Sequence, residues 1–209
     1  NRETKMEIPS KTACFTMMNE MAMMDHIVAH SLMVCRVSLL LADRLIEEGI
    51  AINRPLVTAA ALLHDITKTR SFSTGEDHAS TGDEYLQGLN YPEVGTIVGE
   101  HVRLKSYSNS KPPSEIEIVN YADKRVLHDE IVDLDRRLAY ILERYAKKAE
   151  DRERITLLWE KTRQLEHRIF SELPLSPEDL NRILNAEDWS SERIEYQTVC
   201  SLNPDSTDT

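Results

Sequence analysis

An imidazole and a carboxylate stand side by side, as His64 and Asp65, near the end of the apolar run T-A-A-A-L-L-H-D-I-T-K at residues 58–68. The alanines and leucines of this run are typical of a buried helix. A carboxylate that loses its water on folding must be paired with another group or bound to a metal ion. We therefore expect other parts of the chain to supply partners for His64 and Asp65.

Candidate partners lie in or beside other segments with apolar helical patterning. With the His-Asp pair, they make a set of four histidines and two aspartates: His30, His64, Asp65, His78, His101 and Asp123. Imidazole nitrogens and carboxylate oxygens form a mixed donor set that suits iron, manganese or zinc rather than calcium. The residue types thus predict a site for a divalent metal ion.

The order of these residues resembles the HD-domain metal-dependent phosphohydrolases. The resemblance runs from about His26 to Tyr145, and the pattern H…HD…H…H…D is met by His30, His64-Asp65, His78, His101 and Asp123. A six-ligand set is similar to the subgroup of the family that holds two metal ions. One departure is Thr67, which stands where the family more usually has the glycine of H-D-I-G. This change removes no ligand, although it can alter the end of the helix.

The resemblance implies a metal-dependent phosphoric ester hydrolase with two divalent ions. One ion is expected on His30, His64, Asp65 and Asp123, and Asp65 is expected to bridge to a second ion on His78 and His101. The residues themselves argue only that a carboxylate with two oxygens can serve two ions. Asp65 and Lys68 are the expected catalytic residues. Lys68, Arg103 and Lys105 are expected to bind the phosphate of a small phosphorylated substrate such as a nucleotide.

Other interpretations of these residues stay open. Lys68, three residues after Asp65, lies on the same side of a helix, but it can also be an ordinary solvated lysine at a helix end. HD-like proteins with two irons can activate dioxygen, and a non-catalytic regulatory module can use a metal ion for structure alone. Lys68 favours the phosphohydrolase over the oxygenase. The complete ligand set disfavours the regulatory module, which usually lacks a ligand.

The elements that must position these side chains are expected to be helices. The chain has 209 residues, only 6 glycines, 6% aromatic residues, 29% charged residues and long segments with a period of 3.6 residues. This combination favours an all-α protein, an HD-type helical bundle with a C-terminal helical extension. We expect an N-terminal helix within residues 1–24, the metal-binding domain at 25–148, and the helical extension with its tail at 149–209.

Capping residues and helix breakers locate the helices more closely. Helices are expected to be capped by Ser10, Asp25 and Ser114, to begin near Asn53, and to end at Gly49. Residues 77–88 and 92–101 are expected to be helical, 70–76 to be a loop, and 104–113 to be a connector or a flap over the site. His26, four residues before His30, is interpreted as a packed or supporting histidine.

The last third of the chain carries fewer candidate groups. Amphipathic helices are expected around residues 134–145 and 155–170, with a short helix at 180–184 and a polar tail at 203–209. The amphipathic helices can pair with each other, dock on the metal domain, or expose an apolar stripe that would favour a homodimer.

Composition also restricts the partners and the compartment. A net charge of −11 disfavours binding of a nucleic-acid polymer. Three cysteines without C-x-x-C spacing indicate neither a disulfide framework nor a thiolate metal site, which favours a cytoplasmic protein. We expect no membrane association, because no run reaches about 18 apolar residues and the start lacks the layout of a signal peptide.

Overall fold

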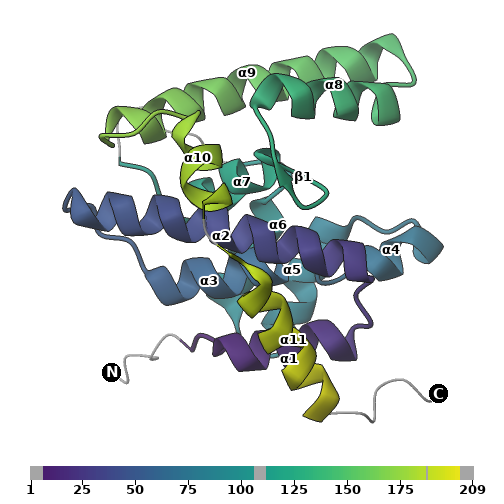
Figure 1. Ribbon diagram of the computed structural model, residues 1–209. Coiled ribbons are helices and arrows are strands. Elements are labelled where there is room, and N and C mark those ends of the chain that lie inside the picture. Colours follow the sequence, from purple (N-terminus) through teal and green to yellow (C-terminus); the bar gives the residue numbers. More distant parts are fainter. Residues whose placement is uncertain (1–6, 106–111, 187, 203–209) are drawn as a thin grey trace, which may run out of the picture.

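The computed structural model describes residues 7–105, 112–186 and 188–202, and most of them are helical (Figure 1). The only strands among these residues, β1 (Val126–Leu127) and β2 (Glu130–Ile131), form an antiparallel pair with Val126 opposite Ile131. The predicted all-α class is confirmed. The helices are α1 (Lys11–Glu20), α2 (Asp25–Glu47), α3 (Arg54–Leu63), α4 (Lys68–Thr74), α5 (His78–Gly88), α6 (Pro92–Glu100), α7 (Glu115–Lys124), α8 (Leu134–Tyr145), α9 (Ala149–Ser171), α10 (Asp179–Asn185) and α11 (Ser190–Leu202).

Most of the predicted helix starts are confirmed by their capping contacts. The Ser10 hydroxyl and the Asn53 side chain each accept a backbone N–H of the first turn that follows, and Ser114 forms a capping box with Glu117. Asp25 is different. It is the first residue of α2 and not its cap, because Met24 occupies the capping position without a side-chain hydrogen bond.

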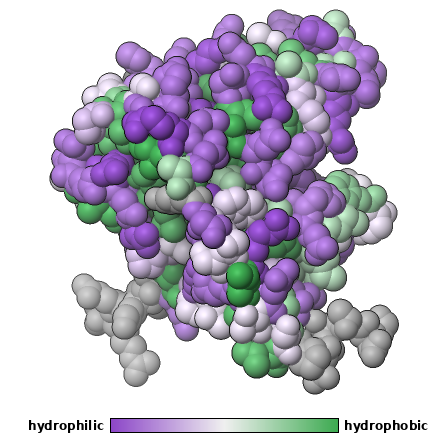
Figure 2. Space-filling model, in the orientation of Figure 1, coloured by the Kyte–Doolittle hydropathy of each residue, from purple (hydrophilic) through white to green (hydrophobic). Residues whose placement is uncertain are grey.

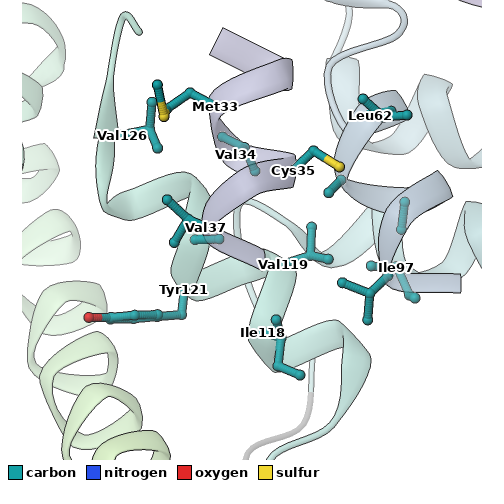
Figure 3. Close-up of a cluster of buried hydrophobic side chains, with 14 of the residues drawn as sticks. Met33, Val34, Cys35, Val37, Leu62, Ile97, Ile118, Val119, Tyr121 and Val126 are labelled. Carbon is teal, nitrogen blue, oxygen red and sulfur yellow. The ribbon is translucent and has the colours of Figure 1, made fainter. Parts of the chain in front are cut away.

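Helix α2 runs through the middle of the molecule and forms the centre of the core (Figure 1). Figure 3 shows Val34 and Val37 of α2 close to Val119 of α7, within one cluster of buried apolar side chains. By length and composition α2 could cross a membrane, which corrects the expectation that no segment could. However, 78% of that stretch is buried inside the protein, as in the core helix of a soluble domain.

Helices α8 and α9 lie side by side along one side of the bundle (Figure 1), and α9 also docks on the core. Trp159 and Leu165 of α9 are buried, and the Trp159 Nε1–H donates to the Leu134 carbonyl at 2.8 Å. The part of the surface over α8 and α9 is mainly hydrophilic on the face shown in Figure 2. Two of the predicted arrangements therefore occur together: α8 and α9 pair with each other, and α9 docks on the metal-binding domain. The hydrophobic cluster takes residues from all three predicted segments of the chain, whose boundaries stay a prediction.

Two segments differ from the sequence predictions. The predicted loop at 70–76 is wrong, since residues 68–74 form α4, and the hydroxyls of Ser71 and Ser73 donate to the carbonyls three residues before them. Gly75, with φ of 72°, ends this helix. Helix α11 was not predicted, and it packs on α1 through an edge-on contact of Tyr196 with Phe15. The predicted flap at 104–113 and the tail at 203–209 fall largely or wholly outside the described residues.

The contact between α5 and α6 depends on a glycine. A Cβ at Gly95 would lie 2.9 Å from the backbone oxygen of Asp83, so alanine there must push the two helices apart. We expect Gly95→Ala to lower the free energy of unfolding by about 1–3 kcal/mol in urea titrations. Gly88→Ala is the matched control, because its Cβ would meet nothing within 4 Å. Equal stabilities of the two variants would contradict this close packing.

The three cysteines are free, in agreement with the prediction of no disulfide framework. Burial raises the pKa of Cys14 and of Cys35 to about 12, so both thiols stay protonated in the folded protein at every pH well below 12. Thiolates, not thiols, attack disulfide reagents. At pH 8 we expect an aromatic disulfide reagent to modify only Cys200 rapidly, and all three cysteines after denaturation. Rapid reaction of Cys14 in the folded chain would contradict the packing of α1.

Candidate metal centre

The six predicted ligands come together where several helices end. His64 directly follows the last residue of α3, and His101 directly follows the last residue of α6. His78 is the first residue of α5, Asp123 lies one residue before the end of α7, and His30 lies on α2. Residues separated by more than 90 positions thus meet at one place in the interior.

Asp65 stands between two groups of donor atoms. Its Oδ2 lies 3.4 Å from the Nε2 of His64, whereas its Oδ1 lies 3.2 Å from the Nε2 of His78 and 3.5 Å from that of His101. The ligand atoms of His30, His64 and Asp65 form one compact group, and those of Asp65, His78 and His101 form another. The two oxygens of a single carboxylate therefore face two possible ion positions.

Asp123 extends the first group. Its Oδ1 lies 3.1 Å from the Nε2 of His30 and 3.8 Å from the Nε2 of His64. Donor atoms that share an ion at about 2.1 Å are about 3.0–3.4 Å apart in octahedral or tetrahedral geometry. Most separations within the two groups are close to that range.

The backbone fixes which nitrogen each imidazole presents to the centre. The Nδ1 atoms of His30, His64 and His101 lie 2.6–2.8 Å from the carbonyl oxygens of His128, Ala61 and Val98. A carbonyl can only accept, so each Nδ1 must carry the proton. In a neutral imidazole, Nε2 is then a lone-pair donor, which is the form that binds metal ions.

Several of these donor atoms lack a suitable partner within the protein. The buried His64 Nε2 and Asp65 Oδ1 have no hydrogen-bond partner among the described residues. The neutral His30 Nε2 faces the carboxylate of Asp123, and the Nε2 atoms of His78 and His101 lie 3.2 Å apart. Lone pairs that face each other at such distances repel unless a proton or a cation lies between them. The residues therefore fit divalent metal ions.

Metal binding requires neutral imidazoles and ionised carboxylates. Most groups of the centre meet this requirement; at His64 burial lowers the pKa, but Asp65 and Asp123 outweigh it and raise the pKa, so a metal ion would displace a proton there. Burial lowers the pKa of His101 to about 4 and also lowers the pKa of His30. Burial opposes ionisation of Asp65, but His64 and Lys68 hold the pKa of that carboxyl well below its usual value. Burial also opposes ionisation of Asp123, but the nearby cations Lys124 and Arg137 help to hold the pKa of that carboxyl well below its usual value.

Comparison with known proteins identifies the segment that holds this centre. Residues 27–127 match the family model of the HD domain, and they contain all six predicted ligands. The chain contains an HD domain. The resemblance drawn from the six residues is thereby confirmed at the level of the family.

Two curated relatives share part of this chain. One, named tRNA (cytidine(56)-2'-O)-methyltransferase, is from Picrophilus torridus and is 29% identical over 150 residues, covering 68% of this chain and 42% of that protein. The other, named dihydroneopterin 2',3'-cyclic phosphate phosphodiesterase, is from Methanocaldococcus jannaschii. It is 33% identical over 113 residues, covering 47% of this chain and 45% of that protein. The chain thus spans less than half the length of either relative. No solved structure is significantly similar to it.

The threonine that departs from the usual family motif contacts the backbone of a predicted ligand. Thr67 is buried, and its hydroxyl donates to the carbonyl oxygen of His78 at 2.8 Å. Its φ of −101° is one that any residue can adopt, so the chain needs no glycine there. Thr67 therefore links the turn that carries Asp65 to the start of the helix that carries His78.

We expect Thr67→Val to weaken one half of the metal centre. Valine keeps the shape of threonine and removes its hydroxyl, so His78 loses a restraint on its position. Loss of such supporting contacts typically lowers metal affinity about 10- to 100-fold. Titration of the metal-free protein with Mn²⁺ should show one weakened step, with the free energy of unfolding of the metal-free chain little changed. Two unchanged binding steps would show that Thr67 does not position His78.

Lys68 contacts the centre of the HD domain directly. Its Nζ lies 2.7 Å from the Asp65 Oδ2, through the turn between α3 and α4, and its side chain is 28% exposed. Burial alone would lower the pKa of Lys68, but Asp65 and Asp123 raise it, so the ammonium is charged at neutral pH. Lys68 and Asp65 both line a cavity that is open to solvent.

The cavity beside the HD centre has a volume of about 140 Å³ and one wall made by α8. Its lining includes His30, Asp65 and Lys68 together with Arg137 and Tyr140 of α8. Sequence reasoning missed these α8 residues because charged and aromatic groups on an amphipathic helix usually face solvent. The i, i+3, i+7 spacing of Arg137, Tyr140 and Arg144 was a usable signal of one common face.

Of three further residues considered in the sequence, only His26 lines this cavity, and it is exposed. Arg103 and Lys105 line a different cavity of about 350 Å³, next to α9, which shares no lining residue with the first. Their predicted role in holding phosphate stays a prediction, with no contact to the six ligands among the described residues.

Proposed function

We propose that this chain is a metal-dependent phosphohydrolase that cleaves a small phosphoester. The observation that supports this most is the position of Asp65, whose two oxygens face two groups of imidazole nitrogens while Lys68 lies beside it. A carboxylate shared by two donor groups suits a pair of ions. A cation at the same carboxylate suits a phosphate. The second relative bears the name of a phosphodiesterase, which agrees with this chemistry.

In this proposal His30, His64, Asp65 and Asp123 hold one divalent ion, and Asp65, His78 and His101 hold another. Bound divalent ions supply an activated water and neutralise charge on phosphoryl oxygens. The protein contributes the rest. Backbone carbonyls keep the imidazoles in the tautomer that binds metal, and burial excludes bulk water from the ligands. Lys68 and Arg137 both line the cavity and provide positive charge there.

The test is a substrate screen on metal-loaded protein. The chain is stripped with chelator, loaded with Mn²⁺, Zn²⁺ or, without oxygen, Fe²⁺, and offered phosphomonoesters, linear phosphodiesters and 2',3'-cyclic phosphates. We expect phosphate release or ring opening that needs the metal and stops with chelator. If folded, loaded protein cleaves none of these esters, the hydrolase proposal fails. Oxygen-dependent consumption of a polyol by the iron form would favour the oxygenase chemistry instead.

A further inference from the structure

The cavity beside α9 is lined by an unusual concentration of positive charge. It is formed by α9, by the segment that follows α6 and by Asn120 of α7, and its volume of about 350 Å³ is within the range of small-molecule sites. Its charged lining consists of Arg103, Lys105, Arg154 and Lys161, with no acidic side chain among the described residues that line it. Four cations thus share one cavity in a chain whose net charge is −11.

Most of these cations have no counter-ion in the protein. Arg103, Lys105 and Lys161 form no salt bridge within the described part of the chain. Arg154 pairs with Asp151 at 3.2 Å, but its side chain is 65% exposed, and an exposed pair of this kind contributes little. Like charges in one cavity repel each other, and a cavity lined by one sign of charge concentrates ions of the opposite sign. The cavity therefore favours a ligand with several negative charges.

The four cations come from two separate parts of the chain. Arg154 and Lys161 are seven residues apart on α9, so they lie on the same face of that helix, with Leu158 between them. Arg103 and Lys105 belong to a segment that is not helical. A ligand that contacts both pairs of cations therefore connects α9 to the segment that follows α6.

This segment begins at a predicted metal ligand. His101 lies two residues before Arg103, and its carbonyl oxygen accepts a hydrogen bond from the Nδ2 of Asn120 at 2.9 Å. The same nitrogen donates to the carbonyl oxygen of Glu100 at 2.8 Å, and Asn120 also lines the cavity. The cavity is thus linked to the backbone of His101 both along the chain and through Asn120.

We propose that this cavity is a second ligand site, which binds a small polyanion such as a diphosphate, and that the bound anion fixes the segment that follows His101. Guanidinium groups match the oxygens of phosphate, and two linked phosphates supply enough negative charge to contact cations of both parts of the chain. The site is separate from the phosphate position at Lys68, because the two cavities share no lining residue. The polyanion is a regulator of the metal centre and not its substrate, and its binding requires neither metal ions nor turnover.

The site is tested by calorimetric titration of the full chain, stripped of metal and shown to be folded by circular dichroism. Pyrophosphate and orthophosphate are titrated separately, and we expect one site per chain that binds pyrophosphate about tenfold more tightly. Lys161→Met should weaken pyrophosphate binding about tenfold, because it removes one charged contact. Arg152→Met is the matched control, since Arg152 lies on the same helix and does not line the cavity.

Hydrogen–deuterium exchange of the backbone amides of residues 101–105 tests the link to the metal centre. Pyrophosphate should slow this exchange in the wild-type chain and much less in Lys161→Met at the same concentration. Unchanged exchange with pyrophosphate bound would overturn the link to His101. Pyrophosphate binding that Lys68→Met abolishes and Lys161→Met leaves unchanged would overturn the site itself, because the anion would then bind at the metal centre.

Discussion

Replacing Asp65 with alanine is expected to abolish turnover and to remove both metal ions at once. Asp65 contributes an oxygen to each of the two ligand groups, so its loss leaves His64 on one side and His78 with His101 on the other without their common carboxylate. Removing one well-placed stabilising group costs an enzyme about 10²–10³ in kcat, and loss of both ions should exceed that. The measurements are metal content after gel filtration and initial rates on the best substrate of the screen.

The chain offers a matched control for this substitution. Asp129 also follows a histidine, but it lies in the turn between β1 and β2 and belongs to neither ligand group. Asp129→Ala should keep its metal ions and its rate. If Asp65→Ala keeps full metal content and activity, the assignment of Asp65 is wrong.

The second large effect is expected at Lys68. Lys68→Met keeps the length of the side chain and removes the charge 2.7 Å from Asp65. We expect kcat to fall by about 10²-fold, with metal content unchanged, because a fixed cation at the phosphate stabilises charge in the transition state. Lys68→Arg should recover part of the rate. Arg70→Met, two residues further along the chain and paired with Glu76, should have no effect.

The same assay separates the three predicted phosphate contacts. Arg103 and Lys105 line the cavity beside α9, away from Lys68. If Lys105→Met raises KM while Lys68→Met leaves kcat and KM unchanged, the phosphate binds in the cavity beside α9, and our assignment of Lys68 is wrong. The opposite result would assign the phosphate to the cavity under α8.

The clustering of the six predicted ligands could be anticipated for two reasons. A buried carboxylate in an apolar run needs partners, and the order of the six residues resembles that of a known family. The second His-Asp pair, His128-Asp129, shows the limit of the dipeptide alone. It lies in a tight turn, where His128 has φ of 57°, and its carbonyl oxygen, not its ring, contacts His30. Apolar context separates the two pairs, since residues 59–63 are apolar and buried.

Sequence reasoning missed features that depend on particular contacts, which composition and periodicity do not show. Helix α4 contains serines and threonines, which have low helix propensity, yet their hydroxyls bond to carbonyls of the same helix. The placement of α8 over the metal centre could not be predicted, because an amphipathic pattern shows which face is buried but not the element that buries it. Arg137 became visible as a site residue only once α8 was placed.

The most direct test of this account is elemental analysis of protein purified without added metal and then of the same protein incubated with Fe²⁺, Mn²⁺ or Zn²⁺ and desalted. The account predicts about two divalent ions per chain after loading, and about one in the His78→Ala/His101→Ala double variant. A folded wild-type chain that retains less than one ion under every loading condition would contradict it.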